Sequence, residues 1–277
     1  MVKTLTQEET KEQLEALGIE TSPLESFAFL DQADNIRYDW HAHKRHQLLY
    51  AFSGTLRLEA ENGLYLLPPQ RAVWIPARVL HRTTLQKVRS GSVFLAPLLV
   101  PTEIARVRII SAAPIVREMV RYALRWPSTR DPDDLLANAW FRTMGLLCAE
   151  WIRDEMPFHL PAARTDQVAR AIEYTLQNLE SATMEAAAKA AALSERHFRR
   201  RFDMETGIAW RLFLHQARML RAMELLAEAD ANITDVSYAV GFNSLSAFAK
   251  SFALFSGQLP SKYRRFASQA FSAGTGL

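Results

Sequence analysis

The sequence predicts an α+β protein: a small antiparallel β-barrel, then a helical connector, then an all-helical domain at the C-terminus. Three observations carry this prediction. Short runs rich in Val, Tyr, Leu and Trp fill residues 36–95 between turn signals. Apolar residues then recur at helical spacing from residue 114 onward, and one helical pattern occurs twice, fifty positions apart. We place the domains at 1–100, 101–164 and 165–277.

The composition is typical of a soluble globular protein, because 49% of the 277 residues are hydrophobic and 23% are charged. The formal net charge of +3 permits a nucleic-acid partner without requiring one. A single cysteine, Cys148, cannot form an internal disulfide, which fits a reducing cytosol. The N-terminal segment is charged, and no run approaches the ~20 apolar residues of a membrane span. We therefore expect a cytoplasmic protein without a membrane partner.

Local signals mark the ends of several elements in the first part of the chain. Thr6 followed by Glu9 has the spacing of a capping box and predicts the start of a helix. The pair Asn62-Gly63 predicts a hairpin between TLRLEA and LYLL, because both residues tolerate positive φ. The run VRII at 107–110 is expected to form one last strand.

The connector is expected to contain two amphipathic helices. Pro114 suits the first turn of the first helix, and Pro157 and Pro161 predict a linker after the second. The apolar stripes expose more surface than one barrel needs, so we expect a homodimer that forms through residues 105–155. The stripe of the second helix consists of Leu136, Trp140, Met144, Leu147 and Trp151.

The C-terminal domain uses one helical unit twice. In each copy a serine, Ser194 or Ser244, is placed to cap the following helix. Two phenylalanines four residues apart share one face, so they are expected to pack inward. The opposite face is then free to enter the major groove of DNA, where arginine binds guanine or phosphate. The outer face carries Glu195, Arg196, Arg199 and Arg200 in the first copy, and Leu245, Ser246, Ala249 and Lys250 in the second.

This C-terminal domain resembles the AraC/XylS family of transcriptional regulators. The resemblance covers about a hundred residues and rests on four blocks in the expected order: SERHFRRRF, GIAWRLFLHQARMLRAMELLA, GFNSLSAFAKSF and GQLPSKYRR. It implies two helix-turn-helix units joined by one long helix, with the recognition helices in successive major grooves. It also implies that the residues of the two outer faces contact DNA, that RNA polymerase is a partner, and that the regulator is commonly an activator.

The sequence departs from the family pattern in the turn of the first unit. The family usually has glycine where this chain has Ala192. If the turn needs positive φ there, alanine costs roughly 1 kcal/mol in strain. The helix before this turn, AAAKAAAL, has few polar side chains, so it is expected to make few phosphate contacts.

Three histidines and a glutamine form a second candidate site. In a strand His41 and His43 share one face, so they can converge on one point. The spacing HxH-x3-Q from His41 to Gln47, followed later by PxR-x2-H ending at His81, resembles the two cupin motifs. Gln47 replaces the usual glutamate, and Arg78 replaces a glycine. The resemblance implies a cupin-like barrel that binds an effector.

Two interpretations of this cluster stay open. One is a divalent metal site, with zinc or nickel favoured by imidazole ligands. The other is a metal-free pocket in which the histidines bind an effector directly or bond within the barrel. His46 is expected on the other face of the strand. The metal set would be His41, His43, Gln47 and His81, and the effector set adds Tyr50 and Trp74.

The function that follows is a sequence-specific regulator that binds double-stranded DNA and responds to a small-molecule effector. The alternative is a cupin metalloenzyme with an accessory helical domain. Against the enzyme, the sequence places no second acid or base group beside the histidines, and the helical half would have no role.

Overall fold

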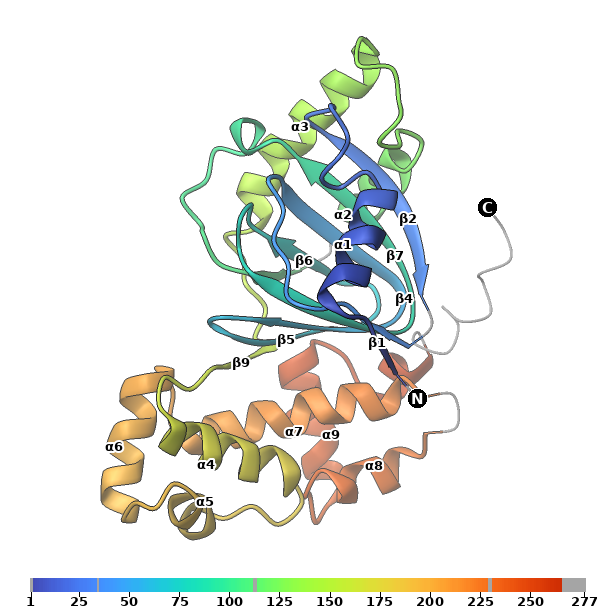
Figure 1. Ribbon diagram of the computed structural model, residues 1–277. Helices are drawn as coiled ribbons and strands as arrows, with labels where there is room; N and C mark the ends of the chain where they lie inside the picture. Colours follow the sequence, from blue (N-terminus) through green and yellow to red (C-terminus); the bar gives the residue numbers. More distant parts are fainter. Residues whose placement is uncertain (1, 34, 112–113, 229–230, 266–277) are drawn as a thin grey trace. The chain divides into compact units, whose positions relative to one another are not determined.

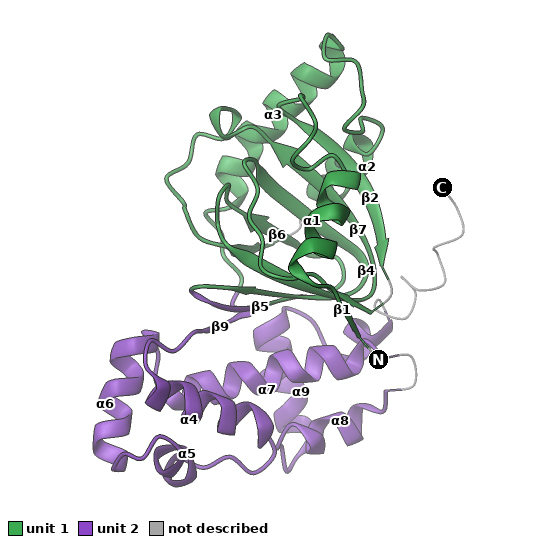
Figure 2. Ribbon diagram, viewed as in Figure 1, with its two compact units in different colours: residues 1–61, 65–156 green, residues 62–64, 157–277 purple. Residues whose placement is uncertain are grey.

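A computed structural model describes residues 2–33, 35–111, 114–228 and 231–265. The chain forms two compact units, residues 1–61 with 65–156 and residues 62–64 with 157–277 (Figure 2). The expected C-terminal domain extends over residues 266–277, which lie outside the described residues.

The first unit is built on a curved sheet in which two strands of fifteen residues, β4 (His46–Ala60) and β7 (His81–Leu95), pair along most of their length (Figure 1). The other edge of β7 pairs with β2 and β3, while β4 also pairs with β6. This arrangement bends the sheet around an interior. The shorter strands are β1 (Lys3–Thr4), β2 (Phe27–Ala33), β3 (Ile36–Arg37), β5 (Gly63–Leu67), β6 (Ala72–Ile75) and β8 (Arg108–Ile110).

Three local expectations for this unit are confirmed. Helix α1 (Gln7–Ala16) begins with the capping box, in which the Thr6 hydroxyl accepts the Glu9 N–H at 3.2 Å and the Glu9 carboxylate accepts the Thr6 N–H at 2.8 Å. β4 ends and β5 begins around Asn62-Gly63, as the hairpin signal predicts. The last expected strand is present as β8.

The helical segment that we expected to be a separate connector belongs to the first unit. It contains the 3-10 turn η1 (Pro97–Leu99), α2 (Pro114–Ala123) and α3 (Leu135–Trp151). The helices pack on the sheet face that points away from its interior, because their apolar faces complete one core with it. That core includes Leu48, Tyr50 and Trp74 from the sheet, Val116 and Val120 from α2, and Phe141, Met144 and Cys148 from α3.

The second unit is helical apart from β9 (His159–Pro161) and the first two residues of β5. Phe198 and Phe202 in one repeat, and Phe248 and Phe252 in the other, are fully buried, which confirms the inward packing expected from their spacing. Its helices are α4 (Asp166–Gln177), α5 (Met184–Ala190), α6 (Glu195–Thr206), α7 (Trp210–Leu226), α8 (Ile233–Ala239) and α9 (Leu245–Ser256). Within the described ranges of both units, no helix is long and apolar enough to cross a membrane.

Candidate nucleic-acid interface and effector pocket

Helix α6 presents an arginine-rich face to solvent. Ser194 caps it as expected, accepting the N–H of His197 at 3.4 Å. Arg196, Arg199 and Arg200 are all exposed on the side opposite the buried phenylalanines. Glu195 is exposed as well and pairs with Arg199 at 3.3 Å, so this acid orients one of the three cations. A helix with this face can donate hydrogen bonds to guanine or to phosphate.

Helix α9 has the same construction with a less basic outer face. Ser244 caps it by accepting the N–H of Ala247 at 3.4 Å. Leu245, Ser246 and Lys250 are exposed, and Ala249 is half-buried. The structure therefore places all eight predicted DNA-contact residues on two outer helix faces, although their contact with DNA stays a prediction. The face of α9 offers one cation and little hydrogen-bonding capacity for bases.

The turns before these two helices differ in the residue that takes the left-handed conformation. In the second helix-turn-helix repeat Gly241 has φ +80°, and a Cβ there would lie 2.6 Å from the carbonyl oxygen of Glu180 and 2.6 Å from the Arg218 guanidinium. In the first helix-turn-helix repeat the non-glycine Ala192 has φ 54°. The turn therefore does need positive φ at Ala192, and the alanine is strained in a backbone conformation that favours glycine.

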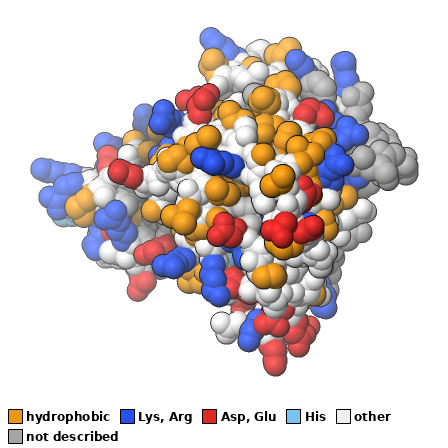
Figure 3. Space-filling view, turned by 90° about the horizontal axis from the view of Figure 1, so that it is seen from above, with side chains coloured by type: hydrophobic (Ala, Val, Ile, Leu, Met, Phe, Trp, Pro, Cys, Tyr) orange, Lys and Arg blue, Asp and Glu red, His pale blue; other side chains and the backbone are white. Residues whose placement is uncertain are grey.

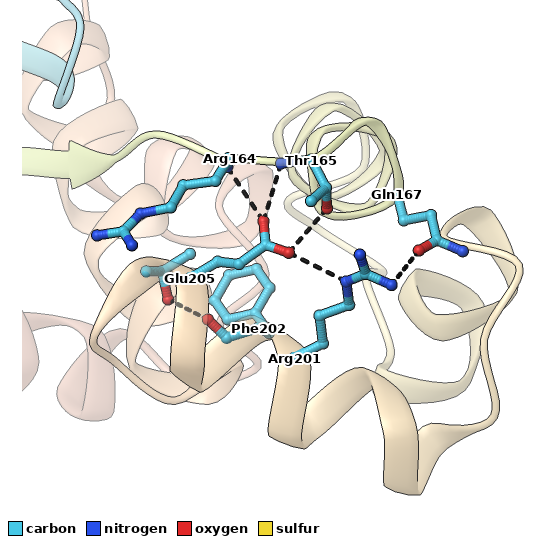
Figure 4. Close-up of polar contacts among 7 residues, drawn as sticks. Arg164, Thr165, Gln167, Arg201, Phe202 and Glu205 are labelled. Carbon is cyan, nitrogen blue, oxygen red and sulfur yellow. Dashed lines mark hydrogen bonds and ion pairs between the residues drawn. The ribbon is translucent and has the colours of Figure 1, made fainter.

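The carboxylate of Glu205 joins the C-terminal part of α6 to the start of α4 (Figure 4). It accepts the backbone N–H groups of Arg164 at 3.1 Å and Thr165 at 3.0 Å, and the Thr165 hydroxyl at 2.8 Å. Arg201 donates to it at 3.1 Å and also to Gln167. Thr165 precedes α4 without a side-chain cap of its own, so Glu205 supplies the cap from another helix.

Glu205 keeps its negative charge despite being buried. Desolvation raises its pKa, but the hydrogen bonds from Thr165, Arg201 and the backbone together outweigh this effect and hold the pKa below its usual value. Sequence reasoning missed this residue. The sequence did contain a signal for it, because Glu205 lies seven positions after Phe198 and therefore on the same, buried face of α6.

His41, His43 and His81 come together in the interior of the first unit, as predicted. The route differs from the expected strand parity, because β4 begins only at His46 and residues 42–45 are irregular. His41 is held instead by an isolated bridge to His81, with N–H···O distances of 2.8 and 2.9 Å. The ring of His81 lies 4.3 Å from that of His41 and 5.2 Å from that of His43, centroid to centroid.

Each of these imidazoles bonds a backbone carbonyl through Nδ1: His41 with Asp39 at 2.8 Å, His43 with Arg45 at 2.6 Å, and His81 with Val79 at 2.9 Å. Nδ1 therefore carries a proton, and Nε2 of a neutral ring is an acceptor. Burial lowers the pKa of all three, that of His43 to about 4. The cluster is consequently uncharged at neutral pH.

Gln47 lies beside the cluster, as expected. The Gln47 amide lies between His43 Nε2, 3.1 Å away, and the Ser92 hydroxyl, 2.9 Å away. Because a neutral His43 that donates through Nδ1 can only accept at Nε2, the amide nitrogen must face the ring and the amide oxygen must accept the Ser92 hydroxyl. His43 is thus engaged at both ring nitrogens. Over the residues that the structure describes, no three His, Cys, Asp or Glu side chains are disposed to hold a metal ion. A metal at this cluster would require the bond between Gln47 and His43 to break.

The cluster lines a cavity of about 50 Å³ between the sheet and α1. Tyr50 and Trp74, which we expected in the effector set, do not line it. Gln47 points into the interior, so Tyr50, three residues later, points to the opposite face, and Trp74 pairs with Leu48 on that same face. The lining residues are Leu14, Leu17, Ile19, Phe29, Asp31, Tyr38, His41, His43, Gln47, Leu49, Leu56, His81, Thr83, Leu85, Ser90 and Ser92.

His46 faces away from this cavity, in agreement with strand parity, but it is half-buried rather than free on the surface. Its Nδ1 accepts the N–H of Ala77 at 2.9 Å, and its ring lies 4.8 Å from that of Trp74. These contacts give His46 a structural role.

Two family models match the chain. An AraC-like ligand-binding domain matches residues 24–140, and a helix-turn-helix domain matches residues 187–265. The first match includes strands β2 to β8, the histidine cluster and part of α3, and the second includes both recognition helices. Together they span more than half of the chain.

Proteins of similar sequence are described as helix-turn-helix transcriptional regulators. The HTH-type transcriptional regulator NimR of Escherichia coli K12 is 27% identical over 240 residues, which is 83% of each chain. YobQ of Bacillus subtilis 168 is described as an uncharacterized HTH-type transcriptional regulator. It is 24% identical over 82% of this chain and 89% of its own length. Among solved structures, the DNA-binding domain of AdpA in complex with a target DNA is 32% identical, with a TM-score of 0.36, over 40% of this chain and 100% of that domain.

Proposed function

Because this chain belongs to the AraC family of DNA-binding transcriptional regulators, with an N-terminal ligand-binding domain, we propose that it binds specific DNA sites through α6 and α9 in response to a small effector. The observation that carries this proposal is the exposed row of three arginines on α6, opposite two fully buried phenylalanines. We further propose that it acts as an activator that contacts RNA polymerase, as is common in the family.

The two recognition helices are assigned different tasks. Arg196, Arg199 and Arg200 can form bidentate bonds with guanine, so α6 reads base sequence. Leu245 can pack against a thymine methyl, and Lys250 can bind a phosphate, so α9 mainly fixes the position of the protein on the duplex.

The effector site is the cavity beside the histidine cluster. Metal-free binding is the first candidate, because His41 and His81 line the buried cavity and their Nδ1 bonds leave Nε2 as an acceptor. Zinc or nickel bound by His41, His43, Gln47 and His81 is the second candidate. The Nδ1 bonds to backbone carbonyls favour it, because such bonds orient metal-ligating histidines.

A homodimer through the helices of the first unit is the proposed assembly. The space-filling view in Figure 3 shows hydrophobic side chains gathered on the face that it presents. On α3, Leu135 is 83% exposed, Leu136 55% and Leu146 57%, while Met144 of the predicted stripe is fully buried in the core. The exposed leucines are therefore the residues available to a second copy.

Selection of binding sites from random duplex DNA by the full-length protein tests the proposed function. We expect one enriched motif, and we expect Arg196→Ala to weaken binding to it by about 1–3 kcal/mol with relaxed preference at one or two bases. Lys11→Ala, on the exposed face of α1, is the control and should leave DNA binding unchanged. Absence of an enriched motif, or full discrimination by the Arg196 variant, would contradict the assignment of α6.

A further inference from the structure

One carboxyl and one hydroxyl face each other across two strands inside the first unit. Asp31 of β2 pairs directly with Ser90 of β7, so both side chains are on one face of the sheet, and both line the cavity. Ser90 is 1% exposed, and its Oγ has no hydrogen-bond partner in the structure. A buried polar group of this kind usually has a partner, so its orientation toward a cavity points to a ligand.

Asp31 is the one residue of the cavity wall with a formal charge at neutral pH, because the wall contains no Lys or Arg and its three imidazoles are uncharged. No ion pair involving Asp31 occurs in the portion of the chain that the structure describes. Burial raises the pKa of Asp31, and the charge of Asp31 contributes to the raised pKa of Tyr38. A cation beside this carboxyl would offset the cost of burying it.

The remaining wall is mainly apolar and encloses little space. Leu14 of α1, Phe29, Leu49, Leu56 and Leu85 face the cavity. Its volume of about 50 Å³ accommodates roughly four non-hydrogen atoms if each needs ~10–15 Å³. A short alkyl chain fits these walls, whereas an anion would meet a carboxylate and no cationic group.

We propose that the effector cavity binds a small aliphatic ammonium ion, whose N–H donors are accepted by the Asp31 carboxylate and the Ser90 hydroxyl and whose alkyl part packs on the apolar wall. This inference rests on the proposed function, because it names the ligand class of the same pocket. The neighbouring His41 and His81 offer further acceptors at Nε2 for a ligand or for a bridging water.

Three probes with the same number of non-hydrogen atoms separate charge from shape. Propylammonium, propan-1-ol and acetate are titrated into the full-length protein, and binding is followed by calorimetry and by ligand-observed NMR. We expect propylammonium to bind and the other two to bind at least about tenfold more weakly. Asp31→Asn should weaken propylammonium binding by about tenfold to a hundredfold, because a charge-assisted hydrogen bond is lost.

Two further variants test the second contact and control for a general loss of negative charge. Ser90→Ala should weaken propylammonium binding by about threefold to tenfold, and Asp133→Asn, an exposed acid of the same unit, should not change it. If Asp31→Asn fails to fold, the Ser90 variant and the three probes in the wild-type protein still decide. Equal binding of propanol, or propylammonium binding that both site variants leave unchanged, would overturn the proposal. DNA selection that succeeds while no amine binds would refute this inference alone, whereas failed selection would refute the proposed function.

Discussion

Glu205 of the first recognition helix caps the helix that begins after Thr165, forty residues earlier in the chain. The bond from Arg201 to the same carboxylate places one arginine of the SERHFRRRF block in the scaffold rather than on the DNA-facing side. The orientation of α6 is thus tied to α4 by a buried ion and its hydrogen bonds, which makes Glu205 a positioning residue for the DNA-reading face.

We therefore expect Glu205→Gln to lower the free energy of unfolding of the second unit by about 2–3 kcal/mol, because an amide cannot accept from all these donors. Urea unfolding of the full-length protein measures this change, and Glu228→Gln, at an exposed position of the same unit, should stay within about 0.5 kcal/mol of wild type. Equal stability of the two variants would show that Glu205 contributes no cap.

The pH dependence of the same unit carries a second signature of Glu205. Its pKa is lower in the folded protein than in the unfolded chain, so the stabilisation is complete above the unfolded value of about 4.3 and is lost as the pH falls through the folded pKa. The wild-type protein should lose more stability below about pH 4.3 than Glu205→Gln does. Parallel acid unfolding curves would contradict this.

Ala192→Gly should stabilise the first helix-turn-helix unit. The left-handed alanine costs about 1 kcal/mol, and the greater freedom of glycine in the unfolded chain offsets about 0.5 kcal/mol of that gain. A net gain of about 0.5 kcal/mol should appear in thermal unfolding. Gly241→Ala is the mirror experiment and should destabilise strongly, because its Cβ would lie 2.6 Å from a backbone oxygen as well as requiring positive φ.

Leu136→Asp should weaken the proposed homodimer without unfolding the protomer, because this leucine is 55% exposed on α3. Sedimentation velocity at roughly tens of micromolar, where a dimer with a micromolar Kd is mostly assembled, is expected to show a dimer for wild type and a monomer for the variant. Leu80→Asp, in an exposed loop of the same unit, is the control and should leave the dimer intact. A monomeric wild-type protein at this concentration would contradict the proposed homodimer.

Features that depend on neighbouring residues could be predicted from the sequence. The capping roles of Thr6, Ser194 and Ser244 are confirmed, because a cap needs only a side chain and a backbone N–H two or three positions away. The left-handed turn at Ala192 is expected only because the resembling family usually has glycine there, and the structure has φ 54° at this residue.

Features that depend on strand register or on distant contacts could not be predicted in this way. The pairing of Asp31 with Ser90 is visible only once β2 and β7 are aligned, and the cap that Glu205 gives to Thr165 joins two helices forty residues apart. The assignment of Tyr50 to the pocket is different, because it could have been avoided. An odd separation from Gln47 within one strand already places the two side chains on opposite faces.

The histidine cluster gives the last prediction, which separates metal binding from direct contact with the effector. Because Gln47 engages His43 Nε2, we expect full-length protein purified without a polyhistidine tag to contain zinc or nickel well below one equivalent. The double variant His41→Ala, His43→Ala should nevertheless lose the effector response, because it removes acceptors from the cavity wall. His46→Ala, which faces away from the cavity, should retain that response.

Elemental analysis of the purified proteins and effector-dependent DNA binding are the two measurements. Stoichiometric metal that disappears in the double variant together with the response would instead establish a metal-dependent sensor, and Gln47 would then have to release His43 on metal binding. An unchanged effector response in the double variant would restrict His41 and His43 to a structural role. The effector would then contact the other end of the cavity, where Asp31 and Ser90 lie.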